Sequence, residues 1–132
     1  MILDIMLMLL HYINLEMNLE FIREYCLSKH QVEESFPFDA FTLVFKIGGK
    51  IFALCGIEDF KSINLKCDPE KSIDLRERYE GIKPGFHMNK KHWNTVNVFQ
   101  DVDHQLVLQL IDHSYDLVLK SLPKKIRDGI TI

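Results

Sequence analysis

Three runs of alternating side chains within residues 41–66 constrain the fold of this chain most strongly. In the first run, residues 41–47, every second side chain is large and apolar, which is the period-two pattern of a β-strand. Gly48-Gly49 follows and predicts a two-residue hairpin turn, because glycine adopts positive φ angles without steric cost. Residues 50–56 and 61–66 repeat the strand pattern, so the segment predicts a three-stranded meander.

Helical periodicity lies on both sides of this meander. An amphipathic helix is predicted over about residues 18–29, with Asn18 as its N-cap, and residues 33–37 are predicted to break the chain after it. Asp68-Pro69 begins a second helix, because proline suits the first helical position. Asp103 caps a long third helix with a wide apolar stripe, and a short helix follows it at the end of the chain.

Two further strands, residues 82–87 and 93–99, are predicted between the second and third helices. The order α-β-β-β-α-β-β-α predicts an α+β fold, a two-layer sandwich whose antiparallel sheet carries its helices on one face. Strand alternation assigns apolar side chains to the helix side: Ile63, Leu65, Val96 and Val98. It assigns mostly polar side chains to the outer face, which is either a binding platform or a solvated surface: Ser62, Asn64, Lys66, Trp93, Thr95 and Asn97.

Length and charge limit the classes of function. A chain of 132 residues is one domain by size, and its net charge of −3 argues against a strongly electrostatic nucleic-acid binder. The segment from Lys83 to His92 differs from the rest, since it contains three Lys, two His and no acidic residue. The sequence therefore predicts a small local basic patch on a nearly neutral monomer.

The cysteines and histidines indicate no metal or disulfide chemistry. Cys26, Cys55 and Cys67 show no CxxC spacing, which favours free thiols in a reducing, cytoplasmic setting. His87 and His92 are the only close pair of histidines, and no third ligand lies beside them in the sequence. We therefore expect no metal and no cofactor.

Residues 1–16 are expected to form a dispensable extension, with residues 17–132 as the domain. The apolar run from Ile2 to Leu10 is shorter than the roughly 20 residues that a membrane-spanning helix needs. It also lacks the basic start and the cleavage site of a signal peptide. Either an additional amphipathic helix or an upstream start codon accounts for it, and we expect no membrane association.

The most distinctive segment runs from Phe86 to Val96 and reads FHMNKKHWNTV. From His87 onward it resembles the H-x-N-K-x-H-W-x-T-V signature of the MmcQ/YjbR-like proteins, and the resemblance spans about residues 17–129. It implies a small two-layer α+β fold similar to that of type III secretion chaperones. Such proteins are often described as DNA-binding. In the family, an Arg-Pro pair often precedes the signature, whereas this chain has Lys83-Pro84. The lysine ammonium is a point charge and cannot bind a phosphate or a guanine with two parallel hydrogen bonds, as an arginine guanidinium does.

The DNA-binding hypothesis gives the segment specific roles. Lysines and His92 are expected to meet phosphates, Asn89 and Asn94 to reach bases, and Trp93 to stack on an unpaired base. About four phosphate contacts would give weak, strongly salt-dependent binding. The candidate nucleic-acid or ligand-binding residues are Lys83, His87, Asn89, Lys90, Lys91, His92, Trp93, Asn94 and Thr95.

Three other interpretations stay open. A peptide- or small-ligand-binding module would use aromatic anchors such as Phe36, Phe38 and Trp93, although the two phenylalanines are expected to be tucked under the sheet. An enzyme would need His87 or His92 as acid or base and Cys67 or Ser62 as nucleophile, and no phosphate-cradling glycine loop accompanies them. Finally, Asn89 can close an Asx turn, in which case the segment serves the fold alone.

Overall fold

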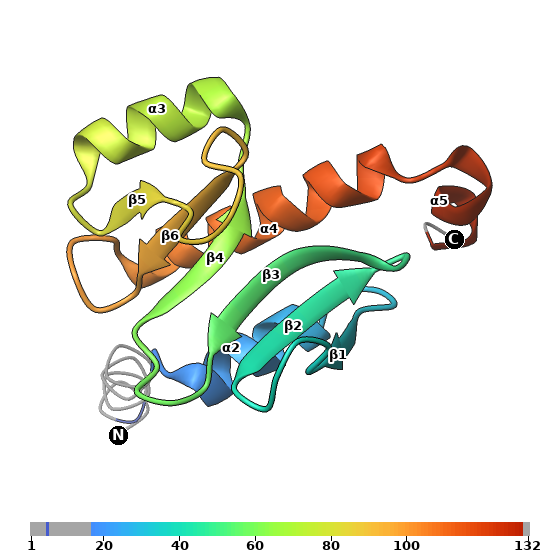
Figure 1. Ribbon diagram of the computed structural model, residues 1–132, viewed down its shortest axis with the longest axis horizontal. Coiled ribbons are helices and arrows are strands. Elements are labelled where there is room, and N and C mark those ends of the chain that lie inside the picture. The colour runs from blue at the N-terminus through green and yellow to red at the C-terminus, as the bar shows by residue number, and fades with distance from the viewer. Residues whose placement is uncertain (1–4, 6–16, 131–132) are drawn as a thin grey trace.

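The computed structural model describes residue 5 and residues 17–130. Its elements, labelled as in Figure 1, follow the predicted order, including the short helix at the end of the chain, with one short strand added between the first helix and the meander. They are α2 (Leu19–Leu27), β1 (Glu33–Ser35), β2 (Thr42–Ile47), β3 (Lys50–Gly56), β4 (Ser62–Lys66), α3 (Pro69–Arg78), β5 (Ile82–Pro84), β6 (Trp93–Asn97), α4 (His104–Ser121) and α5 (Lys124–Ile130). The extension expected over residues 1–16 lies outside the described residues except for residue 5.

The strands form one antiparallel sheet in the order β1-β2-β3-β4-β6-β5. Figure 1 shows α2 and α4 behind this curved sheet, and α4 contacts β2, β3 and β4. The α3 helix lies beside β5 at the end of the sheet. The predicted α+β fold is confirmed. No helix of the described residues is long and apolar enough to cross a membrane.

Local capping chemistry explains where the helices begin. The Asn18 Oδ1 atom accepts a hydrogen bond from the Phe21 N–H at 2.9 Å, so Asn18 is the N-cap of α2. Asp68 caps α3 through the Lys71 N–H, and Asp103 caps α4 through the Leu106 N–H. These three predicted caps are confirmed, because capping depends on residues only three positions apart.

The hairpin between β2 and β3 also follows the prediction. Gly48 and Gly49 have φ angles of 57° and 81°, in the region that glycine alone adopts without strain. A β-carbon at Gly48 would lie 2.6 Å from Leu122 Cδ1, so this turn is also packed closely against the end of α4.

The strand β1 was not expected, because residues 33–37 were predicted only to break the chain. Its three residues pair with β2 in the register Glu34↔Phe45. Glu34 also forms a bidentate ion pair with Arg23 of α2. The Arg23 Nη2 atom lies 2.6 Å from Glu34 Oε1, and Arg23 Nε lies 2.7 Å from Glu34 Oε2. A three-residue edge strand thus forms through contacts that are distant in sequence.

The two faces of the sheet agree with the predicted alternation. Ile63, Leu65, Val96 and Val98 are buried, whereas the residues predicted for the outer face are partly exposed. The core between sheet and helices contains Phe52, whose ring meets that of Tyr115 edge-on at a centroid distance of 5.4 Å. All three cysteines are free and buried.

The sheet opens between β3 and β4. These strands pair only at Ala53↔Leu65 and Leu54↔Asn64. Next to this short ladder, the Ser114 hydroxyl of α4 accepts from the Lys66 N–H and donates to the Phe52 carbonyl. A helix side chain therefore bridges two strands where the sheet curves apart (Figure 1).

Candidate functional site: the outer sheet face

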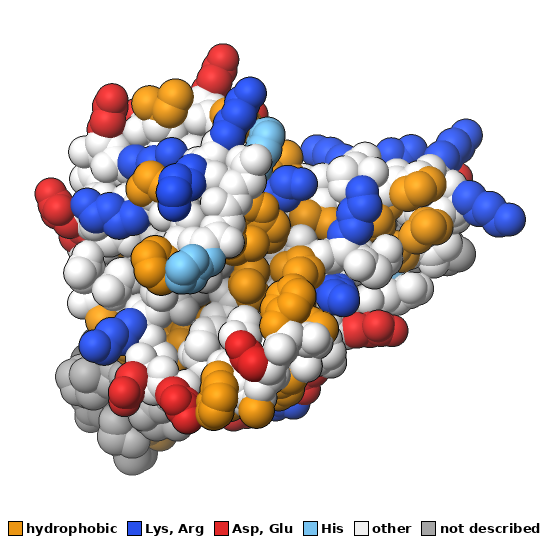
Figure 2. Space-filling model, in the orientation of Figure 1, with side chains coloured by type: hydrophobic (Ala, Val, Ile, Leu, Met, Phe, Trp, Pro, Cys, Tyr) orange, Lys and Arg blue, Asp and Glu red, His pale blue; other side chains and the backbone are white. Residues whose placement is uncertain are grey.

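The outer face of β4, β6 and β5 is the side of the sheet that the helices leave uncovered (Figure 1). Register pairs place Lys66 beside Trp93 and Lys83 beside Thr95 on this face. Figure 2 looks onto it and shows Lys and Arg side chains gathered over its upper part, with acidic side chains mostly near the rim. The surface therefore combines cations with one half-buried tryptophan.

The loop from Gly85 to His92 carries most of the signature. The Asn89 side-chain oxygen accepts from the Lys91 N–H at 3.0 Å and from the His92 N–H at 3.2 Å. The Asn89 carbonyl accepts from the Trp93 N–H, also at 3.0 Å. The proposed Asx turn at Asn89 is confirmed, and this side chain serves the loop conformation.

The lysines and His92 occupy different positions around this loop. Lys90 and Lys91 are exposed, and the Lys90 ammonium donates to the Gly85 carbonyl at 3.1 Å. Lys83 is exposed on β5, with Glu80 3.6 Å away. His92 is partly buried, and its carbonyl accepts from the Cys67 N–H, which extends the pairing of β4 with β6.

Asn94, expected at the binding surface, lies instead in the interior with an exposed fraction of 2%. Strand alternation turns it toward α3, where its amide donates to the Ser72 hydroxyl at 3.2 Å. Its side-chain oxygen accepts from Arg76 Nε at 2.7 Å. Asn94 is therefore not part of the outer surface.

Arg76 of α3 joins this interior network to the signature loop. Its guanidinium also donates to the backbone carbonyls of Lys90 and Trp93. One arginine thus satisfies acceptors from the strand and the loop together, which holds the loop against α3. Nothing in the one-dimensional pattern pointed to Arg76, because its partners are 14–18 residues away.

Replacing Arg76 should loosen this loop. Arg76→Ala removes the donor to Asn94 and to two carbonyls, so we expect the free energy of unfolding to fall by about 1–3 kcal/mol. Urea unfolding followed by Trp93 fluorescence measures the loss. Arg78→Ala is the matched control on the same helix. Its pair with Asp74 is exposed, so we expect the free energy of unfolding to fall by at most about 0.5 kcal/mol. Equal losses for both variants would refute the role of the Arg76 network.

A hollow of about 490 Å³ lies in the outer face beside the start of the signature loop, and we call it the sheet hollow. Phe86 and His87 stand at its edge, with their rings 4.1 Å apart between centroids. His87 adopts a left-handed backbone conformation with φ of 61°, which is uncommon outside glycine. The lining residues are Thr42, Leu54, Cys55, Gly56, Ser62, Asn64, Lys83, Pro84, Phe86, His87 and Thr95.

A chain of hydrogen bonds crosses the sheet hollow. The Phe86 N–H donates to the Thr95 hydroxyl at 3.1 Å, and that hydroxyl donates to the Asn64 side-chain oxygen. The structure thus brings three predicted residues, Lys83, His87 and Thr95, to one hollow. It adds Asn64 and Ser62, which strand alternation had placed on this face without assigning them to a site.

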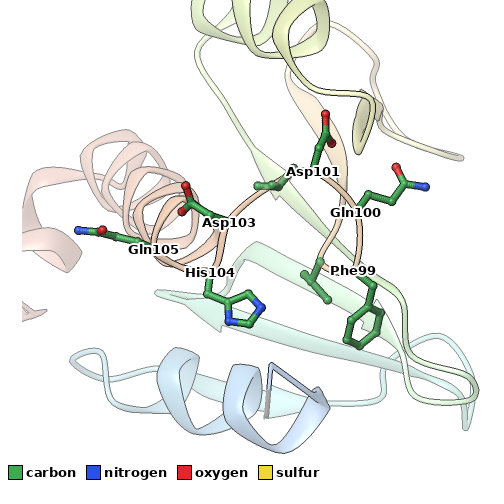
Figure 3. Close-up of a pocket in the computed structure, with 8 residues that line it drawn as sticks. Phe99, Gln100, Asp101, Asp103, His104 and Gln105 are labelled. Atoms are coloured by element: carbon green, nitrogen blue, oxygen red, sulfur yellow. The ribbon is translucent and has the colours of Figure 1, made fainter. Parts of the chain in front are cut away.

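A second hollow, of about 620 Å³, lies along the connection between β6 and α4. The Asp101 carboxylate in it accepts from the Gly81 and Glu80 N–H groups at 2.8 Å, and these bonds lower the pKa of Asp101. In Figure 3, Asp101 and His104 point in opposite directions. No signature residue is among those lining this hollow, which are residues 98–105, and its carboxylate is engaged in joining two loops.

Of the two nucleophiles named for the enzyme hypothesis, Cys67 is poorly placed, whereas Ser62 lines the sheet hollow together with His87. Cys67 is buried, and burial raises the pKa of its thiol, so the thiolate nucleophile is disfavoured. Within residue 5 and residues 17–130, no group of three or more His, Cys, Asp or Glu side chains is positioned to hold a metal ion.

Phe36 and Phe38 differ from the expectation that they are tucked under the sheet. Their exposed fractions are 47% and 64%, because the loop between β1 and β2 projects from the sheet edge. Asp39 shapes this loop by accepting from the Phe41 and Thr42 N–H groups.

Comparison with known proteins identifies the family. The chain is 45% identical over 95 residues to the uncharacterized protein YbdF of Escherichia coli O157:H7, covering 71% of this chain and 78% of that protein. It is 29% identical to YjbR of Escherichia coli K12, covering 84% and 95%. The crystal structure of Deinococcus radiodurans protein DR2400 superposes with a TM-score of 0.81 at 37% identity, covering 87% and 88%. Residues 27–117 match the YjbR family model, and the chain therefore belongs to the YjbR family.

Proposed function

We propose that this protein binds DNA weakly, through the outer sheet face and the signature loop beside it. The observation that carries the proposal is the gathering of Lys66, Lys83 and Trp93 on the uncovered face, with Lys90 and Lys91 exposed in the adjoining loop. Cations meet phosphates, and a tryptophan face stacks on bases. Asn89 and His92 support the loop that presents these groups.

The charge distribution supports weak and salt-dependent binding. Outer-face positions on β4, β5 and β6, all within the described residues, include no acidic side chain. The net charge of the whole chain is nevertheless −3, so long-range attraction to DNA is small. Local phosphate contacts then supply most of the affinity. The logarithm of the binding constant falls linearly with the logarithm of the salt concentration, and we call the steepness of this line the salt slope. Removing one phosphate contact lowers the salt slope by roughly 0.7–0.9.

Removing the loop lysines should weaken DNA binding. For Lys90→Ala with Lys91→Ala, we expect lower affinity and a salt slope reduced by about 1–2, because two phosphate contacts disappear. Titration of Trp93 fluorescence with short DNA at several salt concentrations measures both quantities. Trp93 needs no label, since it is the only tryptophan.

The matched control removes the same charge elsewhere. Lys124→Ala with Lys125→Ala changes two exposed lysines of α5, which lies at the far end of α4 from the signature loop (Figure 1). This variant should retain the wild-type salt slope. If both double variants lose affinity equally, binding follows net charge and the proposed surface is incorrect.

A peptide-binding module is a second candidate, favoured by the exposed aromatic loop. Phe36 lines a hollow of about 560 Å³ together with Leu19, Leu43 and Ile57. Phe38, two residues further along the chain, is exposed. Aromatic side chains of this kind often anchor peptide contacts. Such binding is expected to be indifferent to salt, so the same salt series distinguishes it from DNA binding.

A further inference from the structure

We propose that the sheet hollow receives one unpaired base of single-stranded DNA. This inference rests on the proposed function and deepens it, because it names the form of DNA and the residues that hold a base. A base stacked inside a duplex presents only its edges, whereas a hollow in a protein surface can take the whole ring once it leaves the stack.

The size and lining of the sheet hollow suit a base. Its volume of about 490 Å³ lies within the range of roughly 300–1,000 Å³ that small-molecule sites occupy. Leu54, Pro84 and the Phe86 ring supply apolar surface for the flat faces of a base. Hydroxyl and amide groups of Thr42, Ser62 and Asn64 lie among them and can meet its polar edge.

The hydrogen bonds of Asn64 decide which end of its side-chain amide is left to bind a ligand. Its side-chain oxygen already accepts from the Thr95 hydroxyl, whose own oxygen is used by the Phe86 N–H. Its amide nitrogen has no hydrogen-bond partner within the described residues. Asn64 therefore presents a donor to the hollow, which suits the carbonyl oxygens of thymine, cytosine and guanine.

The charge of the lining favours a nucleotide over a neutral ring. None of the eleven described residues that line the hollow is acidic, and Lys83 is among them, although Glu80 lies 3.6 Å from its ammonium. Lys90 and Lys91 follow in the adjoining loop. A base in the hollow can thus be followed by phosphates that meet these cations.

The experiment compares two oligonucleotides of equal charge. One is a strand of about eight thymidines, within the site sizes known for single-strand binders, and the other has the same backbone with abasic sites. The wild-type protein should bind the thymidine strand about tenfold more tightly than the abasic strand, since stacking and base-edge contacts depend on the base.

Asn64→Asp tests the assigned donor. Aspartate retains an oxygen for the Thr95 hydroxyl but removes the amide N–H groups, so the tenfold ratio should fall, and what remains of it is due to bases stacked on Trp93. The matched control is Asn97→Asp, which adds the same charge on the same face and retains an acceptor for the Phe99 N–H. Asn97 does not line the hollow, so its variant should weaken both strands alike and leave the ratio unchanged.

Each other outcome is decisive. Salt-dependent binding of both strands with a wild-type ratio of one refutes the base site and leaves the proposed DNA-binding function standing. A ratio that survives Asn64→Asp places base recognition outside the sheet hollow and also refutes the inference. If neither strand binds at low salt, the proposed function and the inference both fail.

Discussion

Phe52→Ala is expected to lower the free energy of unfolding by about 3–5 kcal/mol. The Phe52 side chain is 0% exposed and lies between the sheet and α4. Its ring contacts that of Tyr115 edge-on and lies 6.4 Å, between centroids, from that of Phe45. The substitution removes this apolar burial and leaves a cavity that close-packed neighbours fill only in part.

Urea unfolding monitored by circular dichroism and Trp93 fluorescence measures this loss. The control is Phe38→Ala, because Phe38 is 64% exposed and its truncation should change stability by at most about 0.5 kcal/mol. If Phe52→Ala lowers the free energy of unfolding no more than Phe38→Ala does, the Phe52 ring does not pack between the sheet and α4.

Ser114→Ala is expected to lower the free energy of unfolding by about 2–4 kcal/mol, a large effect for the loss of one oxygen atom. The Ser114 hydroxyl accepts from the Lys66 N–H at 2.8 Å and donates to the Phe52 carbonyl at 2.5 Å. Alanine leaves both backbone groups without this partner, and each unsatisfied buried group costs about 1–3 kcal/mol. The same urea experiment measures the effect.

Ser121→Ala on the same helix is the control for Ser114→Ala. Its hydroxyl donates only to the Val118 carbonyl, three residues away within α4, and the residue is exposed. We expect a change within about 0.5 kcal/mol, since alanine is also a good helix former. Similar losses at both positions would mean that the bridge between β3 and β4 contributes little.

Local patterns were sufficient to predict most elements and the two faces of the sheet. Asn18, Asp68 and Asp103 cap helices through bonds that span three residues, so the sequence alone carries the signal. The glycine pair at 48–49 and the alternation along β4 and β6 are equally local. The resemblance of the signature segment likewise gave the family, which the YjbR match confirms.

The candidate site was predictable only in part. Alternation placed Lys66, Trp93 and Thr95 on the outer face, and the burial of their strand neighbours agrees. The sheet hollow was not predicted, because it needs strands β2 to β6 together with the loop at Phe86 and His87. Asn94 was misplaced among surface residues although strand alternation, which puts Trp93 and Thr95 on the outer face, turns it inward. Only the structure reveals its inward partner, Arg76 of α3.

The sequence by itself thus determined the element order, the helix starts, the hairpin turn and the family, because each depends on neighbours along the chain. Only the tertiary structure decided the edge strand β1, the bridge made by Ser114 and the anchoring of the signature loop by Arg76. These features consist of hydrogen bonds and ion pairs between segments far apart in sequence. Their partners become neighbours only when the sheet and the helices pack together.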